Sequence, residues 1–396
     1  MAEPRPVHSD RDPFIDFVRG ASLVVVVLWH WVFTVLVWQD DGPHASNPIG
    51  FTSGLYLATW LLQVMPLFFF VGGWAHTVAL ARFEAAGRGL VWRFTGQRLV
   101  SLTRPAIALA AAWWAVGVLV AALLDVEWTG RAVLLILSPL WFLVVYALLV
   151  ALLPLSTWLH RRFDVLVLVW AAGLAALVDV ARFRWGWDAL GLLNMVLVWG
   201  LCHQLGFFYD RLARAPRQVA WSMAFGGLFT LSALVFSGLY PGSMVGVPGD
   251  RLSNMAPPTV CIAALLVLQV GAAMLVRPWV TERLETRSSW QRATRGMSLV
   301  ALPLYLFHST GMAIWATVVY RAVGFNQAFG MVRDIDIDGV WWASRPLAVI
   351  GPLACTTPMV WAYLRLQRGR QPTAPRGGGA PDDGSAGSEA AVPHPA

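Results

Sequence analysis

Long apolar stretches separated by short polar segments recur along the whole chain of 396 residues. Each stretch has roughly 20 residues, enough for a helix to cross the hydrocarbon core of a bilayer, which is about 30 Å thick. The pattern predicts an all-α polytopic membrane protein with about ten transmembrane helices in one bundle. The predicted spans are Phe14–Trp38, Leu55–Leu80, Leu99–Leu124, Ala132–Leu155, Val165–Val180, Asp188–Phe208, Val219–Tyr240, Pro257–Val276, Met297–Val323 and Val340–Leu364.

The two ends of the chain differ from this domain, which we place at residues 14–366. Residues 1–13 form a short tail without the basic start or the cleavage site of a signal peptide, so we expect the first apolar stretch to remain as a helix. Residues 367–396 are rich in Pro, Gly and Ala, which cannot bury a core, and we expect disorder there. Any chemistry is therefore expected inside the bundle.

The distribution of arginine predicts an orientation. The chain has no Lys and 29 Arg, and with the N-terminus inside, the inner segments hold 20 Arg and the outer loops seven. Cytoplasmic loops carry such an excess, so both termini are predicted to be cytoplasmic. The net charge of +7 then faces lipid headgroups, and no nucleic-acid partner is expected. The lysine-free, Ala- and Arg-rich composition suggests a bacterial genome and hence a bacterial cytoplasmic membrane.

The first apolar stretch, FIDFVRGASLVVVVLWHWVF, carries ionisable residues that a passive anchor does not need. Arg19 and His30 are about three helical turns apart, so they share a face and lie about 16 Å apart along the axis. Asp16 lies one turn before Arg19, within pairing distance. Imidazole can take a proton from a hydroxyl, and guanidinium holds a phosphate or an oxyanion. A hydroxyl acceptor and a phosphate-bearing donor would need this pair.

Each of these residues also has a simpler interpretation. Arg19 can extend to the headgroups, and His30 can hydrogen-bond to a neighbouring helix. Their position on one face favours the functional interpretation, because ionisable groups within spans normally face the bundle interior or a water-filled cavity.

The same residues resemble the opening of the acyltransferase-3 family of integral membrane acyltransferases. The first helix of that family typically reads aspartate, two residues, arginine, ten residues, histidine, and Asp16, Arg19 and His30 match this spacing. Four further stretches are similar to family motifs in the family's order and extend the resemblance over nearly the whole chain except the tail. They are PLFFFVGGWA (66–75), RLVSLTRPAIAL (98–109), PLWFLVVYALLVALLP (139–154) and LPLYLFHS (302–309).

The chain departs from the family pattern in three places. Family members often carry Ser-Gly where this chain has Gly72 and Gly73, so a hydroxyl is missing. The third-helix arginines, Arg98 and Arg104, are six residues apart instead of three. The acidic residue that often follows the fourth-helix Trp has no counterpart, and Tyr146 is the nearest polar group.

The resemblance implies transfer of an acyl group, such as acetyl, from cytoplasmic acyl-CoA to a hydroxyl of a cell-envelope glycan or a small natural product. His30 would act as general base or handle the acyl unit, Arg19 would orient the thioester or the CoA phosphates, and Asp16 would hold Arg19. Arg98 and Arg104 would add contacts to the anionic donor. Acyl-CoA would be a co-substrate, membrane lipid would surround the bundle, and no cofactor would be bound.

Three further residues of the family-like motifs are candidates for the wall of the same cavity: Trp141, Tyr305 and His308. For His308, the alternative is a packed side chain that hydrogen-bonds to a backbone carbonyl. His76 and His203 are expected to be structural or to lie near the interface.

Two other classes of protein remain open. A secondary transporter would use intramembrane Arg and Asp, with internal repeats and paired broken helices, but the two halves show no clear self-similarity. A haem protein would use paired histidines from facing helices, drawn from His30, His76, His203 and His308. The cysteines predict neither a disulfide framework nor a metal site, because they lie in predicted spans without metal-ligand spacing: Cys202, Cys261 and Cys355.

Overall fold

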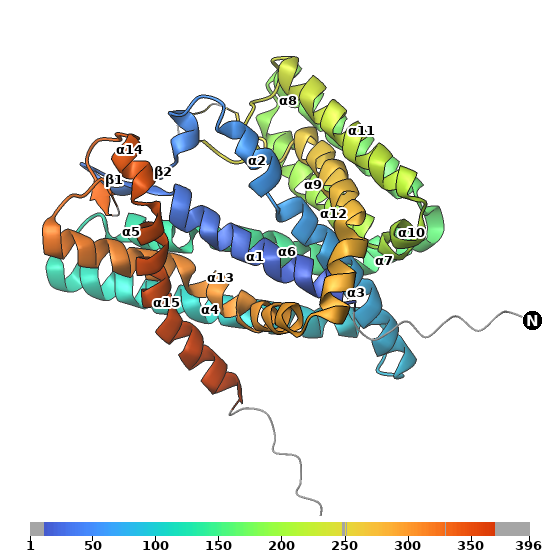
Figure 1. The fold of residues 1–396 in the computed structure, drawn as a ribbon, viewed down its shortest axis with the longest axis horizontal. Coiled ribbons are helices and arrows are strands. Elements are labelled where there is room, and N and C mark those ends of the chain that lie inside the picture. Colours follow the sequence, from blue (N-terminus) through green and yellow to red (C-terminus); the bar gives the residue numbers. More distant parts are fainter. Residues whose placement is uncertain (1–11, 248–249, 251, 329, 369–396) are drawn as a thin grey trace, which may run out of the picture.

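The computed structural model describes residues 12–247, 250, 252–328 and 330–368, whose helices form one bundle (Figure 1). Within the described residues, ten helical segments are long and apolar enough to cross a membrane, which confirms the predicted all-α polytopic architecture. The predicted disordered tail lies outside the described residues from residue 369 onward. The ten segments are Pro13–Phe33, Tyr56–Ala85, Val91–Leu124, Thr129–Ala151, Leu166–Trp185, Asp188–Gly206, Arg217–Phe236, Val260–Thr286, Ser288–Val323 and Arg345–Gln367.

Several of these segments are made of more than one element. The last one begins at Arg345, later than the predicted Val340, because residues 339–343 form a separate short helix. In chain order the elements, with η for 3₁₀ helices, are α1 (Pro13–Phe33), β1 (Val35–Gln39), β2 (Gly42–Ser46), η1 (Pro48–Gly50), α2 (Tyr56–Leu62), α3 (Met65–Ala85), α4 (Val91–Leu124), α5 (Thr129–Leu137), η2 (Ser138–Leu140), α6 (Trp141–Ala151), α7 (Leu153–Phe163), α8 (Leu166–Trp185), η3 (Asp188–Leu190), α9 (Gly191–Gly206), α10 (Tyr209–Arg214), α11 (Arg217–Phe236), α12 (Val260–Thr286), α13 (Ser288–Val323), β3 (Met331–Val332), α14 (Gly339–Ala343) and α15 (Arg345–Arg368).

Helix α1 is fixed at its start by a capping carboxylate. Asp12 accepts a hydrogen bond from the backbone N–H of Phe14 over 2.8 Å, which satisfies a donor that the helix leaves unpaired. The same carboxylate accepts from the Tyr209 hydroxyl over 2.7 Å and so ties α1 to α10. Farther along, Gly20 allows α1 to approach α13, because a Cβ at this position would lie 2.9 Å from the Cβ of Met297. These contacts set the position of the first helix, which carries Arg19 and His30.

The first span is shorter than predicted. Helix α1 ends at Phe33 instead of Trp38, because the following residues form strand β1, which pairs antiparallel with β2 and parallel with β3. Val35 and Val37 alternate inward and pack with Trp341 in a small separate core. Apolar content alone does not separate such a strand from one more turn of helix.

Besides the tenth, two predicted spans are continuous in sequence but broken in structure. The second is split into α2 and α3 at residues 63–64, and the fourth is split into α5 and α6 by η2, where Pro139 lacks a backbone N–H. Non-helical backbone at membrane depth requires hydrogen-bond partners from the protein. The Gln269 amide donates to the Gln63 carbonyl over 2.9 Å, and the Tyr305 hydroxyl donates to the Pro139 carbonyl. Both breaks are therefore stabilised from inside the bundle.

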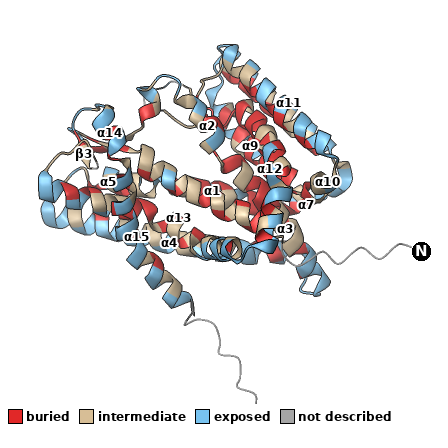
Figure 2. Cartoon of the chain, viewed as in Figure 1, coloured by how far each residue is buried: buried red, intermediate tan, exposed pale blue. Residues whose placement is uncertain are grey.

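The buried interior lies along α1, α3, α9 and α12, and the outer helices are largely exposed (Figure 2). Phe69, Phe70 and Trp199 are among the largest fully buried side chains. The exposed faces of α4 and α11 are apolar, as Trp114 and Phe229 illustrate, with exposed fractions of 68% and 76%. Such faces are unfavourable in water but match the hydrocarbon of a bilayer.

Glycines bring α3 and α9 into backbone contact. A Cβ at Gly73 would lie 1.8 Å from the carbonyl oxygen of His203, and a Cβ at Gly206 would lie 2.0 Å from the carbonyl oxygen of Phe70. No side chain fits at either position, so small residues here let the two helices pack closely.

We expect Gly73→Ala to lower stability by about 1–3 kcal/mol, because the added methyl group forces α3 and α9 apart. The measurement is the unfolding midpoint of the detergent-purified protein. Gly173→Ala in α8 is the control: a Cβ there meets nothing within 4 Å, and alanine favours a helix, so the midpoint should hold or rise. Equal midpoints for the two variants would contradict the close packing.

Candidate active site

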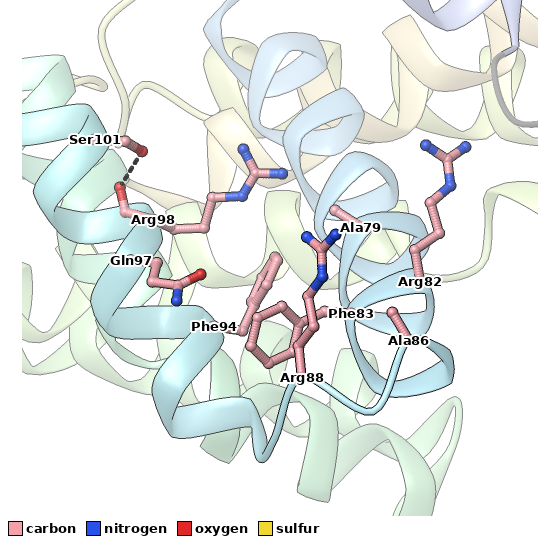
Figure 3. A pocket seen from close by; sticks show the side chains of 9 residues that line it. All are labelled: Ala79, Arg82, Phe83, Ala86, Arg88, Phe94, Gln97, Arg98 and Ser101. Carbon is pink, nitrogen blue, oxygen red and sulfur yellow. Dashed lines mark hydrogen bonds between the residues drawn. The ribbon is translucent and has the colours of Figure 1, made fainter. Parts of the chain in front are cut away.

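A cavity of about 550 Å³ lies where α3 ends and α4 begins, and we name it the arginine cavity (Figure 3). Figure 3 shows Arg82 from α3, Arg88 from the connecting loop and Arg98 from α4 around the same space, beside the rings of Phe83 and Phe94. The Arg98 guanidinium lies 5.3 Å from the centroid of the Phe94 ring, a cation–π contact. None of the described residues that line the cavity is acidic, so its chemistry fits an anion with a flat ring. The lining is Ala79, Arg82, Phe83, Ala86, Arg88, Phe94, Gln97, Arg98 and Ser101.

Asp16 and Arg19 form the predicted ion pair, with 2.8 Å between the Asp16 Oδ1 and Arg19 Nη2 atoms. The carboxylate is mostly buried, whereas the Arg19 side chain keeps 38% of its surface exposed. Tyr146 on α6 faces α3, where its ring centroid lies 5.5 Å from that of His76. Polar groups therefore extend inward from the arginine cavity toward α1.

Tyr146 also accounts for one departure from the family pattern. A Cβ at Gly72 would lie 2.8 Å from the Tyr146 hydroxyl, so the phenol ring occupies the space beside the glycine. The ring needs a residue without a side chain at position 72. The phenol of Tyr146 thus occupies the space that a Ser side chain at this position would fill.

His30 meets His308 across the interface between α1 and α13. Their atoms His30 Nδ1 and His308 Nε2 are 3.2 Å apart, and the second ring nitrogen of His308 lies 2.5 Å from the carbonyl oxygen of Tyr305. The Trp31 indole donates to the His308 carbonyl over 3.1 Å. The structure thus brings together three predicted site residues, His30, Tyr305 and His308, from two distant parts of the chain.

His30 lies in the wall of a second cavity, of about 270 Å³, which we name the histidine cavity. Aromatic rings, amides and hydroxyls surround it, and among the described lining residues only His30 is ionisable in the usual pH range. Both helix breaks border it, which explains why non-helical backbone is tolerated there. The lining is Val26, Trp29, His30, Phe33, Thr34, Ala45, Ser46, Asn47, Leu62, Gln63, Met65, Ser138, Pro139, Trp141, Phe142, Val245, Gly246, Met255 and Tyr305.

The two cavities lie at opposite ends of α3. Met65 at the start of this helix lines the histidine cavity, and Ala79 lines the arginine cavity. These two residues are fourteen positions apart in the helix, so the cavities are separated by about 21 Å along the helix axis.

The predicted site residues divide into three groups. Trp141 and Tyr305 line the histidine cavity beside His30. Arg98 lines the arginine cavity, but Arg104 is exposed on α4 and lines neither of the two cavities. His308 is buried behind His30 instead of lining the cavity wall.

Sequence reasoning missed several lining residues. Arg82 and Arg88 were interpreted only as inner-loop charges, although their closeness to Arg98 around one short loop was a usable signal. The sequence does not mark Gln63 and Asn47 as site residues, because isolated amides have no characteristic spacing. Only the structure shows that both line the histidine cavity.

The geometry argues against the two other classes of protein. The ring of His30 contacts that of His308, with 3.2 Å between two ring nitrogens. The ring of His76 contacts that of His203 in the same way, with 2.9 Å between the nitrogens. Neither pair leaves a gap for a haem between its rings. The two spans that are broken in their interior, the second and the fourth, belong to the same half of the chain, whereas a transporter built from repeats would place them at corresponding positions of its two halves.

These features define an integral membrane protein with a histidine at the wall of one cavity, a second histidine buried behind it, and an arginine-lined cavity at the other end of the bundle. A family model described as an acyltransferase domain matches residues 12–363, nearly the whole chain. The chain therefore belongs to the acyltransferase-3 family, and it is an acyltransferase that transfers groups other than aminoacyl groups. Neither the curated proteins nor the solved structures contain a significant match.

We expect the two cavities to open to opposite sides of the membrane. Ser46→Cys places a thiol in the histidine cavity and Ser101→Cys places one in the arginine cavity. The native Cys202 and Cys261 are buried, and the half-buried Cys355 is changed to Ser in both variants so that it cannot react. In intact bacterial cells an impermeant maleimide should label only Ser46→Cys, and permeabilised cells should label both. Labelling of both in intact cells would contradict this arrangement.

Proposed function

We propose that the protein is a membrane-embedded O-acyltransferase that moves an acyl group, such as acetyl, from cytoplasmic acyl-CoA to a hydroxyl of a cell-envelope glycan or a small natural product. It would reside in a bacterial cytoplasmic membrane with both termini cytoplasmic. The single observation that carries the proposal is the placement of His30, an imidazole in the wall of an intramembrane cavity, in a chain of this family.

The donor fits the arginine cavity. Guanidinium groups bind phosphates through charge-assisted hydrogen bonds, and Arg82, Arg88 and Arg98 offer three of them. The rings of Phe83 and Phe94, whose centroids are 5.5 Å apart, offer a surface for an adenine base. The phosphopantetheine arm would then extend past Tyr146 and Arg19 toward His30.

The reach of the donor agrees with this placement. An extended arm with the chain length of about four residues spans about 14 Å, to which the diphosphate and an arginine side chain add several ångströms. The cavities are about 21 Å apart along α3, so the thioester can arrive at the histidine cavity while the phosphates stay with the arginines.

The acceptor fits the histidine cavity. Trp29, Phe33 and Trp141 offer aromatic faces for the apolar side of a sugar ring or macrocycle, and Asn47 and Gln63 offer amides for hydroxyl groups. Its described lining contains no carboxylate, lysine or arginine side chain, so the part of the acceptor that enters should be uncharged.

The chemistry then needs one base. His30 takes the proton of the acceptor hydroxyl as its oxygen attacks the thioester carbonyl, and a C–O bond forms. The C–S bond breaks, the ester leaves with the acceptor, and the CoA thiolate receives the proton from His30. No group besides the two substrates is consumed.

We expect His30→Ala to lower kcat by about 100- to 10,000-fold at unchanged folding, because the general base is lost. The assay follows CoA release and transfer of the labelled acyl group with purified protein, acetyl-CoA or longer acyl-CoA donors, and a glycan and small-molecule extract of the host. Full activity of His30→Ala would exclude His30 as the base. Absence of transfer in folded wild-type protein with every donor would exclude the proposed function.

We expect Arg98→Ala to raise KM for acyl-CoA by about 10-fold or more, because one charge-assisted hydrogen bond to the donor contributes about 1.5–3 kcal/mol. The acceptor KM should stay constant. Arg295→Ala is the matched control, since Arg295 is an exposed arginine on α13 that bonds to Gln291 and lines neither cavity. Equal donor KM values for the two variants would contradict donor binding in the arginine cavity.

A further inference from the structure

His308 has no place in the proposed reaction, although its ring lies within hydrogen-bond distance of the ring of the proposed base. Its side chain is almost fully buried and does not line the histidine cavity. Three groups surround its ring: the carbonyl of Tyr305, the ring of His30, and the Ser309 hydroxyl at 3.3 Å from Nε2.

The hydrogen-bond partners assign the proton positions of both rings. A carbonyl oxygen can only accept, so the Nδ1 atom of His308, 2.5 Å from the Tyr305 oxygen, must carry a hydrogen. In a neutral imidazole the other nitrogen is then an acceptor, so the Nε2 atom of His308 must accept. Its partner over 3.2 Å is the Nδ1 atom of His30, which must donate. The Nε2 atom of His30 is left with the lone pair.

We propose that His308 is a positioning residue for His30: it holds the His30 ring in its orientation and keeps the proton on Nδ1, so that Nε2 is the base for the acceptor hydroxyl. The inference rests on the proposed function for its catalytic consequence. The hydrogen-bonded chain runs from the Tyr305 carbonyl through His308 to His30 and is itself a property of the fold.

The arrangement does in hydrocarbon what a carboxylate does beside the histidine of a serine-hydrolase triad. A third group that fixes the tautomer and orientation of the base is worth up to about 10⁴-fold in kcat in such triads. A buried carboxylate at membrane depth would cost several kcal/mol without a paired cation, whereas a neutral imidazole does not. When His30 takes the proton, its Nδ1–H becomes a stronger donor to His308.

The surroundings of His308 keep this geometry rigid. The Trp31 indole bonds to the His308 carbonyl, the Tyr305 hydroxyl bonds to the Pro139 carbonyl, and the Trp113 indole donates to the Thr310 hydroxyl over 2.9 Å. One turn of α13 is thereby attached to α1, η2 and α4. The acceptor nitrogen of His308 is held where the His30 ring can use it.

The test compares His308→Leu with His308→Gln. Leucine removes the acceptor, whereas the amide oxygen of glutamine has nearly the reach of Nε2 and can accept from His30. We expect His308→Leu to lower kcat by about 100-fold with KM within about threefold, and His308→Gln to recover most of the loss. Ser309→Ala is the control, because Ser309 touches the same nitrogen of His308 and lies outside the histidine cavity.

Two further measurements separate positioning from mere structural support. In a His30→Ala background, His308→Leu should lower the remaining rate no further, since residues that act as a unit are not additive. Nitrogen-15 NMR of histidine-labelled protein, with the His30 signals assigned by the His30→Ala difference, should show a single Nδ1–H tautomer in the wild type and a mixture in His308→Leu.

Each result decides the proposal. Unchanged kcat in His308→Leu, an equal additional loss in the His30→Ala background, or an Nε2–H tautomer of His30 in the wild type would overturn it. Loss of activity in Ser309→Ala with retention in His308→Leu would assign the role to Ser309 instead. If wild-type protein transfers no acyl group, the proposed function fails, while the tautomer measurement still decides whether His308 orients His30.

Discussion

The structure depends on one constraint: backbone polar groups inside a bilayer must find partners within the protein. An unbroken helix meets this requirement by itself, but a cavity needs places where the helix opens. Here two spans open, and long polar side chains from facing helices satisfy the freed carbonyls: Gln269 at the Gln63 break and Tyr305 at the Pro139 break. The histidine cavity lies between these breaks, so the same bonds that make the fold possible also shape the site.

The distribution of charge follows the same constraint. Arginines cannot lose their charge, and those of the arginine cavity gather at the ends of α3 and α4, where the guanidinium groups can keep contact with water or an anion. The ionisable groups buried inside the bundle include imidazoles, which can be neutral, and the ion pair of Asp179 with Arg182. The rings of His30 and His308 lie within hydrogen-bond distance of each other, and so do those of His76 and His203. The arginine cavity is therefore positively charged, whereas the described lining of the histidine cavity contains no carboxylate, lysine or arginine side chain.

Much of this was accessible from the sequence because it depends on local patterns. Apolar length predicted ten spans, and the spacing of Asp16, Arg19 and His30 predicted both the ion pair and the family. Errors arose where two structures share one apolar pattern: strand β1 was interpreted as the end of α1, and the two broken spans as continuous helices. The helix and strand propensities of the residues do not resolve such cases, since hydrogen-bond partners from distant parts of the chain decide which backbone conformation is stable.

The sequence by itself determined that the protein is a bundle of membrane helices with a histidine near the end of the first one, because length, hydropathy and helical spacing are properties of neighbouring residues. Only the tertiary structure decided which distant groups meet. It joined His30 to His308, set Arg82 and Arg88 beside Arg98, left Arg104 outside both cavities, and filled the space over residue 72 with a tyrosine ring. Those choices follow from how whole helices pack, and packing depends on contacts between residues far apart in the chain.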